Sequence, residues 1–558
     1  MKRLTISAKA RIFLAVFVLG FVFVAYTERA WEDYWITFRA SRNLATGNGL
    51  VFTPGERVHS FTSPLGVLLP AGLSWLTGNG SEELILWLFR LVCLAALAGG
   101  MVLVYAVLKN FALRPLAIGF TLALLALDAK TLDFSTNGME TGLLIFFVAL
   151  SLHGLFVSGP RQCLRLGLGW AGLMWTRPDG CVYIAAMGVG ALLFLRREIP
   201  AAEPARWLAK LSRAALLCAA LYLPWFLWAW WYYGSPVPHT IVAKDLFQPP
   251  LHPASLVAGF FTYPITHMVD LHASIWWTFL PTYSKLDTWQ PIIAIGGLAA
   301  WLAALAWLCP LFRPATRVLS FSFYVGQYFL TDVVRNFFPW YFPGVALLGY
   351  MVLGLVFDEF LGLAGRLPEW HADRGWLRHA RPVLLGGAVF LLVAEMGLTF
   401  CAARLAHVQQ QLIEDGARRP IGLWLRAHAA SPHDTVLLEP LGYIGYFSGL
   451  KMYDFPGLCS KEMVAVRRRL GPEKQNQAYL ELKPDWLVLR PVEAHTGELI
   501  DITHLAELYE PVVVVDVSDR VAAYLWLPGS KYLAGDETFI VYHRKSALPS
   551  VRTGVETH

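Results

Sequence analysis

Long apolar stretches separated by short polar segments recur between residues 11 and 402 of the chain. A helix that crosses the roughly 30 Å hydrocarbon core of a bilayer needs about 20 apolar residues, and a spanning chain must satisfy its backbone hydrogen bonds internally. The stretches that reach or approach this length lie near residues 11–26, 84–108, 113–128, 140–158, 164–176, 180–196, 212–232, 290–310, 317–331, 337–357 and 382–402. We therefore predict a polytopic α-helical membrane protein with about eleven transmembrane helices.

The composition agrees with a membrane protein and argues against a nucleic-acid-binding one. Hydrophobic residues make up 56% of the chain and charged residues 15%, well to the apolar side of soluble domains. Many of the 22 tryptophans lie at the ends of apolar stretches, where membrane–water interfaces favour them. The net charge of +6 comes from short basic clusters between these stretches. We expect the lipid bilayer as a partner and no nucleic acid.

The basic clusters orient the predicted helices. They are Lys2, Arg3, Lys9 and Arg11, then "KNFALR", "RQCLR", "RREIPAAEPARWLAKLSR", "FRPATR" and "RLPEWHADRGWLRHAR". The positive-inside rule places these loops in the cytoplasm. The first stretch is predicted to be an uncleaved signal-anchor, because no A-x-A-like cleavage site follows it. Every unusual polar motif and the C-terminal tail then fall on the outer face.

The tail beyond residue 402 changes character. Its apolar runs shorten to strand length in "DTVLLEP", "LKMYDF", "PDWLVLRP", "EPVVVVDV" and "TFIVYH", with helix-like polar segments between them. We predict a transmembrane domain over residues 1–402, with a first outer loop at 27–83, and a small extracytoplasmic α/β domain over residues 403–558.

That outer loop opens with adjacent carboxylates, Glu32 and Asp33, among aromatic residues at helical spacing. The pattern predicts a helix along the outer surface, with Trp35 and its aromatic neighbours toward lipid and the carboxylates toward a cavity. One acid of such a pair can accept a proton while the other orients a substrate or holds a metal. The alternative is a solvated interfacial helix without chemistry.

Other polar groups converge on the same face. Arg90 lies about two turns inside an apolar helix, where an arginine is costly and faces a lipid phosphate, an ion-pair partner or the interface. The remaining candidates in outer segments are Arg39, His59, Glu140, Arg177, Asp179, His239, Thr240, Lys244 and Arg335. Singly, each also has a structural interpretation, and their convergence is what favours a site.

Four blocks occur in order: "EDYWITFRASRNLATGNGLVFTPGERVHSF", "GMET", "RPDG" and "YYGSPVPHTIVAK". Together they resemble the GT-C superfamily of membrane glycosyltransferases, and within it the arabinofuranosyltransferase-like family of actinobacterial terminal arabinofuranosyltransferases and pilin arabinosyltransferases. Three positions depart from that family's pattern. Glu32 replaces its first aspartate, His59 stands where an acid is typical, and His239 stands where asparagine is usual.

The resemblance implies transfer of a sugar, a pentose such as arabinofuranose, from a polyprenyl-phosphate donor to a hydroxyl. The acceptor would be an envelope glycan, lipid or pilin-like protein at the periplasmic face of a bacterial inner membrane. Asp33 and Glu32 would be catalytic, and Arg90 and Lys244 would bind the donor phosphate. Arg39, His59, Glu140, Arg177, Asp179, His239, Thr240 and Arg335 would bind substrate.

Two other functions and a purely structural or scaffolding role remain open from the sequence. A flippase for lipid-linked sugars would also need a polar cavity, but with functional charge on both faces. A glycan ligase would share the architecture and use a polyprenyl-diphosphate donor. No cofactor is identified, and the need for a divalent cation stays open because the carboxylates show no ligand spacing.

Overall fold

The computed structural model describes residues 7–195, 204–281, 286–335, 338–370, 379–497 and 499–545. A helix lies at every predicted apolar stretch: α1 (Ala8–Thr27), α4 (Glu82–Asn110), α5 (Pro115–Leu127), α7 (Thr141–Phe156), α8 (Gln162–Thr176), α9 (Gly180–Phe194), α10 (Pro204–Tyr233), α14 (Leu286–Leu305), α15 (Pro314–Tyr328), α16 (Phe342–Trp370) and α17 (Ala380–Gln409). Among the described residues, six helices are long and apolar enough to cross a membrane. The chain is a multi-pass α-helical membrane protein, as predicted.

Parts of the predicted cytoplasmic loops, residues 196–203 and 371–378, lie outside the described residues, as do Lys2 and Arg3. The tail after residue 545 does too.

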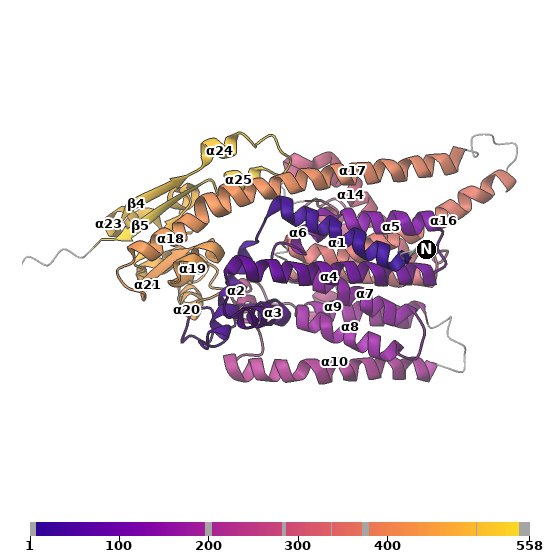
Figure 1. The fold of residues 1–558 in the computed structure, drawn as a ribbon, viewed down its shortest axis with the longest axis horizontal. Coiled ribbons are helices and arrows are strands. Elements are labelled where there is room, and N and C mark those ends of the chain that lie inside the picture. The colour runs from indigo at the N-terminus through magenta and orange to yellow at the C-terminus, as the bar shows by residue number, and fades with distance from the viewer. Residues whose placement is uncertain are drawn as a thin grey trace, which may run out of the picture.

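The helices form a bundle in which α1, α4, α7, α8 and α10 run side by side along the long axis (Figure 1). Small residues let α4 and α7 approach closely, because a Cβ on Gly142 would meet the backbone of Cys93. Buried Leu97, Val148 and Met351 belong to the apolar core of this bundle. The packing fixes the end of the bundle where α7 begins, next to Glu140.

Two short helices, α2 (Glu32–Ala45) and α3 (Pro64–Leu76), lie at the end of the bundle that adjoins the C-terminal segment (Figure 1). Ser63 caps α3 by accepting a hydrogen bond from the backbone of Gly66 over 2.8 Å. A turn at Pro54–Gly55 lies between the two helices, with Gly55 at φ 86°, and no strands flank it in the described chain. Together, α2 and α3 form a shelf at this end of the bundle (Figure 1).

The aromatic face of α2 does not point to lipid, which corrects the prediction from its sequence. Trp35 is 4% exposed and packs on Tyr443, Tyr446 and Phe447 of α19 (Leu441–Ser448), with ring centroids 5.3, 4.8 and 5.0 Å away. A row of aromatic side chains packs against another part of the protein as well as it packs against lipid, so the sequence pattern alone does not distinguish the two. The C-terminal segment therefore covers the helix that carries the acid pair.

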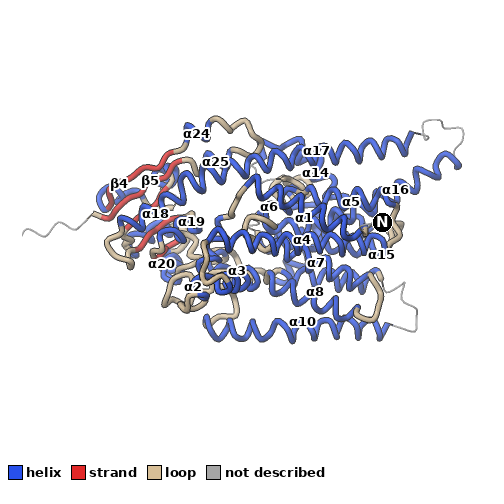
Figure 2. Tube along the Cα trace, viewed as in Figure 1, coloured by secondary structure: helices blue, strands red, loops and turns tan. Residues whose placement is uncertain are grey.

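A five-stranded sheet lies in the C-terminal segment, at one end of the molecule (Figure 2). Its strands are β1 (Thr435–Leu438), β2 (Lys451–Asp454), β3 (Trp486–Leu489), β4 (Tyr509–Asp516) and β5 (Thr538–Arg544), and all five predicted strands are confirmed. The order is β2-β1-β3-β5-β4, with β2, β1 and β3 parallel and β5 antiparallel to both of its neighbours. The central strand β3 is buried throughout, as parallel strands covered on both faces require.

The helices of this segment are α18 (Arg419–His428), α19, α20 (Lys461–Leu470), α21 (Ala478–Leu482), α22 (Pro491–Thr496), α23 (Leu505–Leu508), α24 (Ser518–Ala522) and α25 (Lys531–Ala534). No loop separates the bundle from this segment. α17 continues past residue 403 into a π-helical turn, η5 (Gln410–Arg418), and then into α18. The division at residue 403 therefore remains a prediction, and we use "C-terminal domain" for the segment from Gln410 to Lys545.

Candidate active site

Two cavities meet at Asp33. The bundle cavity has a volume of about 90 Å³ and is lined by Asp33, Glu140, Arg177, Thr240 and Lys244, with Trp340 and Tyr341. The domain cavity has a volume of about 380 Å³ and lies between α2 and the C-terminal domain, and its lining includes Glu32, Asp33, Trp340, Arg418, Glu439, Arg490 and Asp536. Five of the predicted site residues thus share one cavity, and Asp33 lines both.

The carboxylate of Asp33 is free. Asp33 lies in the first turn of α2, where the helix dipole favours an anion. Its side chain makes no hydrogen bond or ion pair within the described ranges. Burial raises the pKa of Asp33 above its usual value, and the charges of Lys244 and Arg177 oppose this shift. A half-buried carboxylate with a raised pKa and no partner is suited to accept a proton.

Lys244 supplies a cation to the bundle cavity. It is the last residue of α11 (His239–Lys244), and its Nζ lies 4.9 Å from the ring centroid of Phe338 and 5.9 Å from that of Trp340. No carboxylate pairs with it in the part of the chain that the structure describes. An ammonium held by aromatic rings and without a counter-ion can bind a phosphate.

The cation of Arg177, in contrast, is already neutralised. Its Nε lies 2.9 Å from Asp179 and its Nη1 3.6 Å from Glu140, and the guanidinium stacks on Tyr341 at 4.5 Å. Glu140 and Arg177 line the bundle cavity, whereas Asp179 lies behind Arg177 and outside the lining. The three residues form a rigid charged wall, with Asp179 orienting Arg177.

The loop that precedes α11 is fixed by two histidines. His59 stacks on Tyr233 with centroids 4.3 Å apart, and its backbone oxygen accepts a hydrogen bond from the N–H of His239 over 3.0 Å. Burial lowers the pKa of His59 to about 4, so its ring is neutral at neutral pH. Neither histidine lines the bundle cavity or the domain cavity, but Thr240 lines the bundle cavity, and its Oγ1 is buried with no partner among the described residues.

Three predicted substrate or phosphate ligands have other partners. Arg90 donates to the backbone oxygens of Thr136, Glu28 and Arg29 at 2.8, 2.9 and 2.7 Å. Neither Arg90 nor the arginines discussed next line the two cavities. The fork of Arg90 therefore ties α4 to the end of α1, and the geometry does not support a phosphate ligand at this position.

Arg39 and Arg335 also make contacts that lie away from the two cavities. Arg39 is 7% exposed and donates to the backbone oxygens of Gly445, Gly449 and Leu450 at 2.6, 2.8 and 2.9 Å. It clamps α2 to the C-terminal domain. Arg335 donates to the backbone oxygen of Pro249 over 3.1 Å on the exposed surface. Their donors are directed to protein carbonyls, away from the cavities.

Glu32 lines the domain cavity, but both of its oxygens have partners. Oε1 accepts a hydrogen bond from the backbone N–H of Gly442 over 3.0 Å, and Oε2 lies 3.0 Å from Nη1 of Arg418. The next residue, Asp33, is therefore the only one of the two acids whose carboxylate lacks a partner in the described chain.

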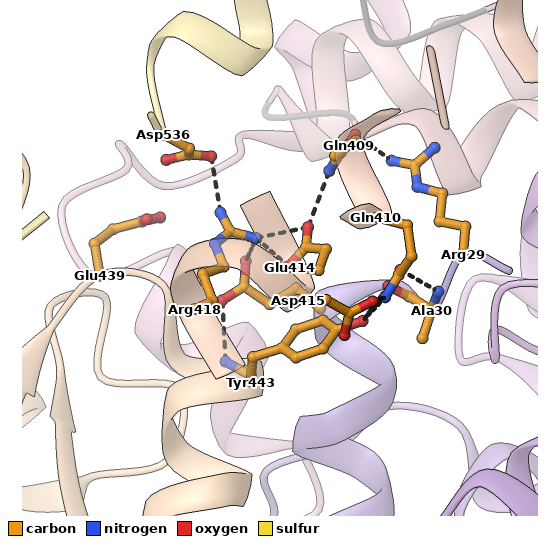
Figure 3. A network of polar contacts seen from close by, with 12 residues as sticks. Arg29, Ala30, Gln409, Gln410, Glu414, Asp415, Arg418, Glu439, Tyr443 and Asp536 are labelled. Carbon is orange, nitrogen blue, oxygen red and sulfur yellow. Dashed lines mark hydrogen bonds and ion pairs between the residues drawn. The ribbon is translucent and has the colours of Figure 1, made fainter. Parts of the chain in front are cut away.

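Five charged residues of the C-terminal domain that line the domain cavity were missed by sequence reasoning: Arg418, Glu439, Arg490, Lys531 and Asp536. Figure 3 shows Arg418 between Asp536 and Glu414, with Glu439 beside them. Glu439 and Arg490 directly follow strands β1 and β3, Arg418 ends η5, and Lys531 and Asp536 precede β5, but no motif in the sequence distinguishes them. The described residues contain no group of three or more His, Cys, Asp or Glu side chains that could hold a metal ion.

Comparison with known proteins gives relatives for both parts of the chain. Over 260 residues it is 32% identical to the terminal β-(1→2)-arabinofuranosyltransferase of Corynebacterium glutamicum, a match covering 42% of this chain and 36% of that protein. The protein of the same name from Mycobacterium tuberculosis is 26% identical over 268 residues, which cover 44% and 40% of the two chains. The matches thus span about two-fifths of these relatives' length. The predicted resemblance to the arabinofuranosyltransferase-like family is confirmed.

The solved structure of ArnT from Cupriavidus metallidurans in the apo state superimposes over 95% of this chain and 96% of its own, with a TM-score of 0.51 and 14% identity. The fold is the GT-C fold. A family described as a domain of unknown function (DUF8728) matches residues 405–542. The GT-C architecture therefore extends along the chain, and this domain family accounts for its C-terminal part.

Proposed function

We propose that the chain is a membrane glycosyltransferase that moves a sugar, a pentose such as arabinofuranose, from a polyprenyl-phosphate donor to a hydroxyl. The acceptor is an envelope glycan, lipid or pilin-like protein. The reaction takes place at the bundle end that carries the C-terminal domain, which the positive-inside rule assigns to the periplasmic face of a bacterial inner membrane.

One observation carries this proposal: the unpartnered carboxylate of Asp33 lies where the bundle and domain cavities meet. A transferase must bind its donor and its acceptor next to each other, with the acceptor oxygen placed against the reacting carbon of the donor. The bundle cavity holds Lys244, the cation suited to the donor phosphate. In the domain cavity, Arg418 and Arg490 are paired with carboxylates, which suits a hydroxyl-bearing acceptor better than a second phosphate.

The reaction is a single displacement. The acceptor oxygen forms a bond to the anomeric carbon while the bond from that carbon to the phosphate oxygen breaks. Asp33 takes the hydroxyl proton, and the polyprenyl phosphate leaves with the bonding electron pair, stabilised by Lys244. Glu140, Arg177 and Thr240 shape the pocket around the sugar. No step in this scheme requires a metal ion, and whether a divalent cation assists is a question for titration with a chelator.

Purified full-length protein in nanodiscs tests the reaction class. We expect a polyprenyl-phosphate pentose to be consumed, with polyprenyl phosphate and a glycosylated acceptor as products detected by mass spectrometry. Turnover of a polyprenyl-diphosphate oligosaccharide instead would identify a glycan ligase. Movement of lipid-linked sugar across proteoliposomes without bond cleavage would identify a flippase.

Replacing Lys244 by Gln is expected to raise the KM for the donor by about tenfold, because a charge-assisted bond to phosphate contributes at least about 1.5 kcal/mol. The KM for the acceptor should change much less. Steady-state kinetics with each substrate varied in turn measures both values.

Arg90→Gln serves as the contrasting variant, because its fork holds backbone carbonyls. It is expected to lower thermal stability and leave the donor KM unchanged. If instead Arg90→Gln weakens donor binding while Lys244→Gln does not, the phosphate lies on the α4 side of the site and the assignment of Lys244 is wrong.

A further inference from the structure

The C-terminal domain contacts the acid pair through two groups. Arg418, at the end of η5, and Gly442, at the start of α19, hold the two carboxylate oxygens of Glu32, each at 3.0 Å. Both residues lie in the region that matches the domain of unknown function. Glu32 is thus held from outside the bundle, by a part of the chain whose role the sequence motifs do not explain.

Arg418 is the centre of a charged network (Figure 3). Its side chain is 1% exposed and also contacts Glu414 at 3.0 Å and Asp536 at 2.8 Å. Asp536 in turn receives Arg490 at 2.5 Å. A buried guanidinium is tolerated only where carboxylates and hydrogen bonds compensate its charge, so these groups constrain one another. Glu32 is one of three carboxylates on a single cation and has little freedom to move.

The same domain also holds the backbone just before the acid pair. The Oε1 of Gln410 accepts a hydrogen bond from the N–H of Ala30 over 2.9 Å, and the hydroxyl of Tyr443 donates to the backbone oxygen of Ala30 over 3.1 Å. Figure 3 shows Gln410, Tyr443 and Ala30 together on the opposite side of Glu414 from Asp536. The Asp33 side chain has no partner among the described residues, so its position depends on these neighbouring contacts.

We propose that the C-terminal domain is a positioning element of the active site, in which Arg418 holds Glu32 and thereby keeps the Asp33 carboxylate at the junction of the bundle and domain cavities. This role rests on the proposed sugar transfer, in which Asp33 accepts the proton. Arg418 is a positioning residue because its terminal nitrogens are directed to Glu32, Glu414 and Asp536. A general base displaced by about 1 Å can lose about 100-fold in rate.

The electrostatic interactions of Glu32 also support a positioning role for Arg418. Burial raises the pKa of Glu32, the carboxylates of Glu414, Glu439 and Asp536 add to that shift, and Arg418 is the group that opposes it. Loss of the guanidinium would favour the uncharged form of Glu32 and end its ionic contact with the domain. The start of α2 would then be held to the domain by the hydrogen bonds at Ala30 and Gly442 and by the ring contacts of Trp35, without an ionic contact.

The test compares Arg418→Met with Arg467→Met in the full-length chain in nanodiscs. Arg467 is also a buried arginine of this domain, but it donates to Pro456 and Gln475 and contacts no part of α2. We expect Arg418→Met to lower kcat per folded molecule by about 10- to 100-fold with the donor KM changed less than about twofold. Arg467→Met should lower thermal stability and keep the wild-type kcat, and Arg418→Lys should recover part of the rate.

Gln410→Ala is a second variant, which leaves all charged side chains in place and replaces Arg418→Met in the test if that variant does not fold. It removes the hydrogen bond to Ala30 and should also lower kcat. Wild-type kcat in folded Arg418→Met, or in Gln410→Ala where Arg418→Met does not fold, overturns the positioning role, as does an equal loss of kcat in Arg467→Met. A wild-type chain that transfers no sugar overturns the proposed function, and the positioning role with it.

Discussion

Replacing Asp33 by Asn is expected to lower the rate of sugar transfer by about 10²- to 10⁴-fold, the usual contribution of a general base. The amide has nearly the same shape but cannot take the proton of the attacking hydroxyl. Burial raises the pKa of Asp33, so the wild-type rate should fall as the pH drops through a value above that of an ordinary aspartate, about 3.9. That acidic limb should be absent from the residual activity of Asp33→Asn.

The same substitution should leave the protein folded. The Asp33 carboxylate has no hydrogen-bond or ion-pair partner among the described residues, so the amide loses only the longer-range attraction of Lys244 and Arg177, and the cost of burying a charge disappears. Thermal unfolding and kcat measured on one nanodisc preparation separate the two effects. Asp245→Asn is the matched control, because Asp245 is an exposed neighbour of Lys244 that lines neither cavity. Full transfer by folded Asp33→Asn would remove Asp33 from the mechanism.

The transmembrane helices and the strands could be predicted because their signals are local. An apolar run of membrane length, or a short β-branched run such as "PVVVVD", determines its own secondary structure with little help from distant residues. The contacts that build the domain cavity are of another kind. Gly442 and Glu32 are 410 residues apart in the chain, and no periodicity in either segment indicates that they meet.

The arginines show the limit of residue-by-residue reasoning. An arginine in an apolar helix indicates a partner but does not identify it. For Arg90 and Arg39 the partners are backbone carbonyls, which leave no trace in the sequence because every residue has one. Asp33 and Lys244 stood out in the sequence as charged residues of polar motifs next to apolar stretches, and the structure has them in the first turn of α2 and at the end of α11.

The second large effect is expected at Gly442, where α19 approaches the first turn of α2. A Cβ at this position would lie 2.5 Å from Cγ of Glu32 and closer still to its backbone oxygen. Gly442→Ala must therefore move α19 away from α2, which lengthens the 3.0 Å hydrogen bond to Oε1 of Glu32. Overpacking of this kind costs about 1–3 kcal/mol in stability.

The rate of sugar transfer by Gly442→Ala should fall by about tenfold or more, because a displaced α19 no longer holds α2, the helix that carries Asp33. Gly72→Ala is the control: Gly72 lies on α3, on the same shelf, and a Cβ there meets nothing within 4 Å. That change should slightly stabilise the helix and leave transfer unaltered. Thermal unfolding and transfer assays on both variants decide the point. Wild-type stability and rate in Gly442→Ala would mean that α19 and α2 adjust to the extra methyl group without losing their contact. The C-terminal domain would then not be what holds the acid pair in place.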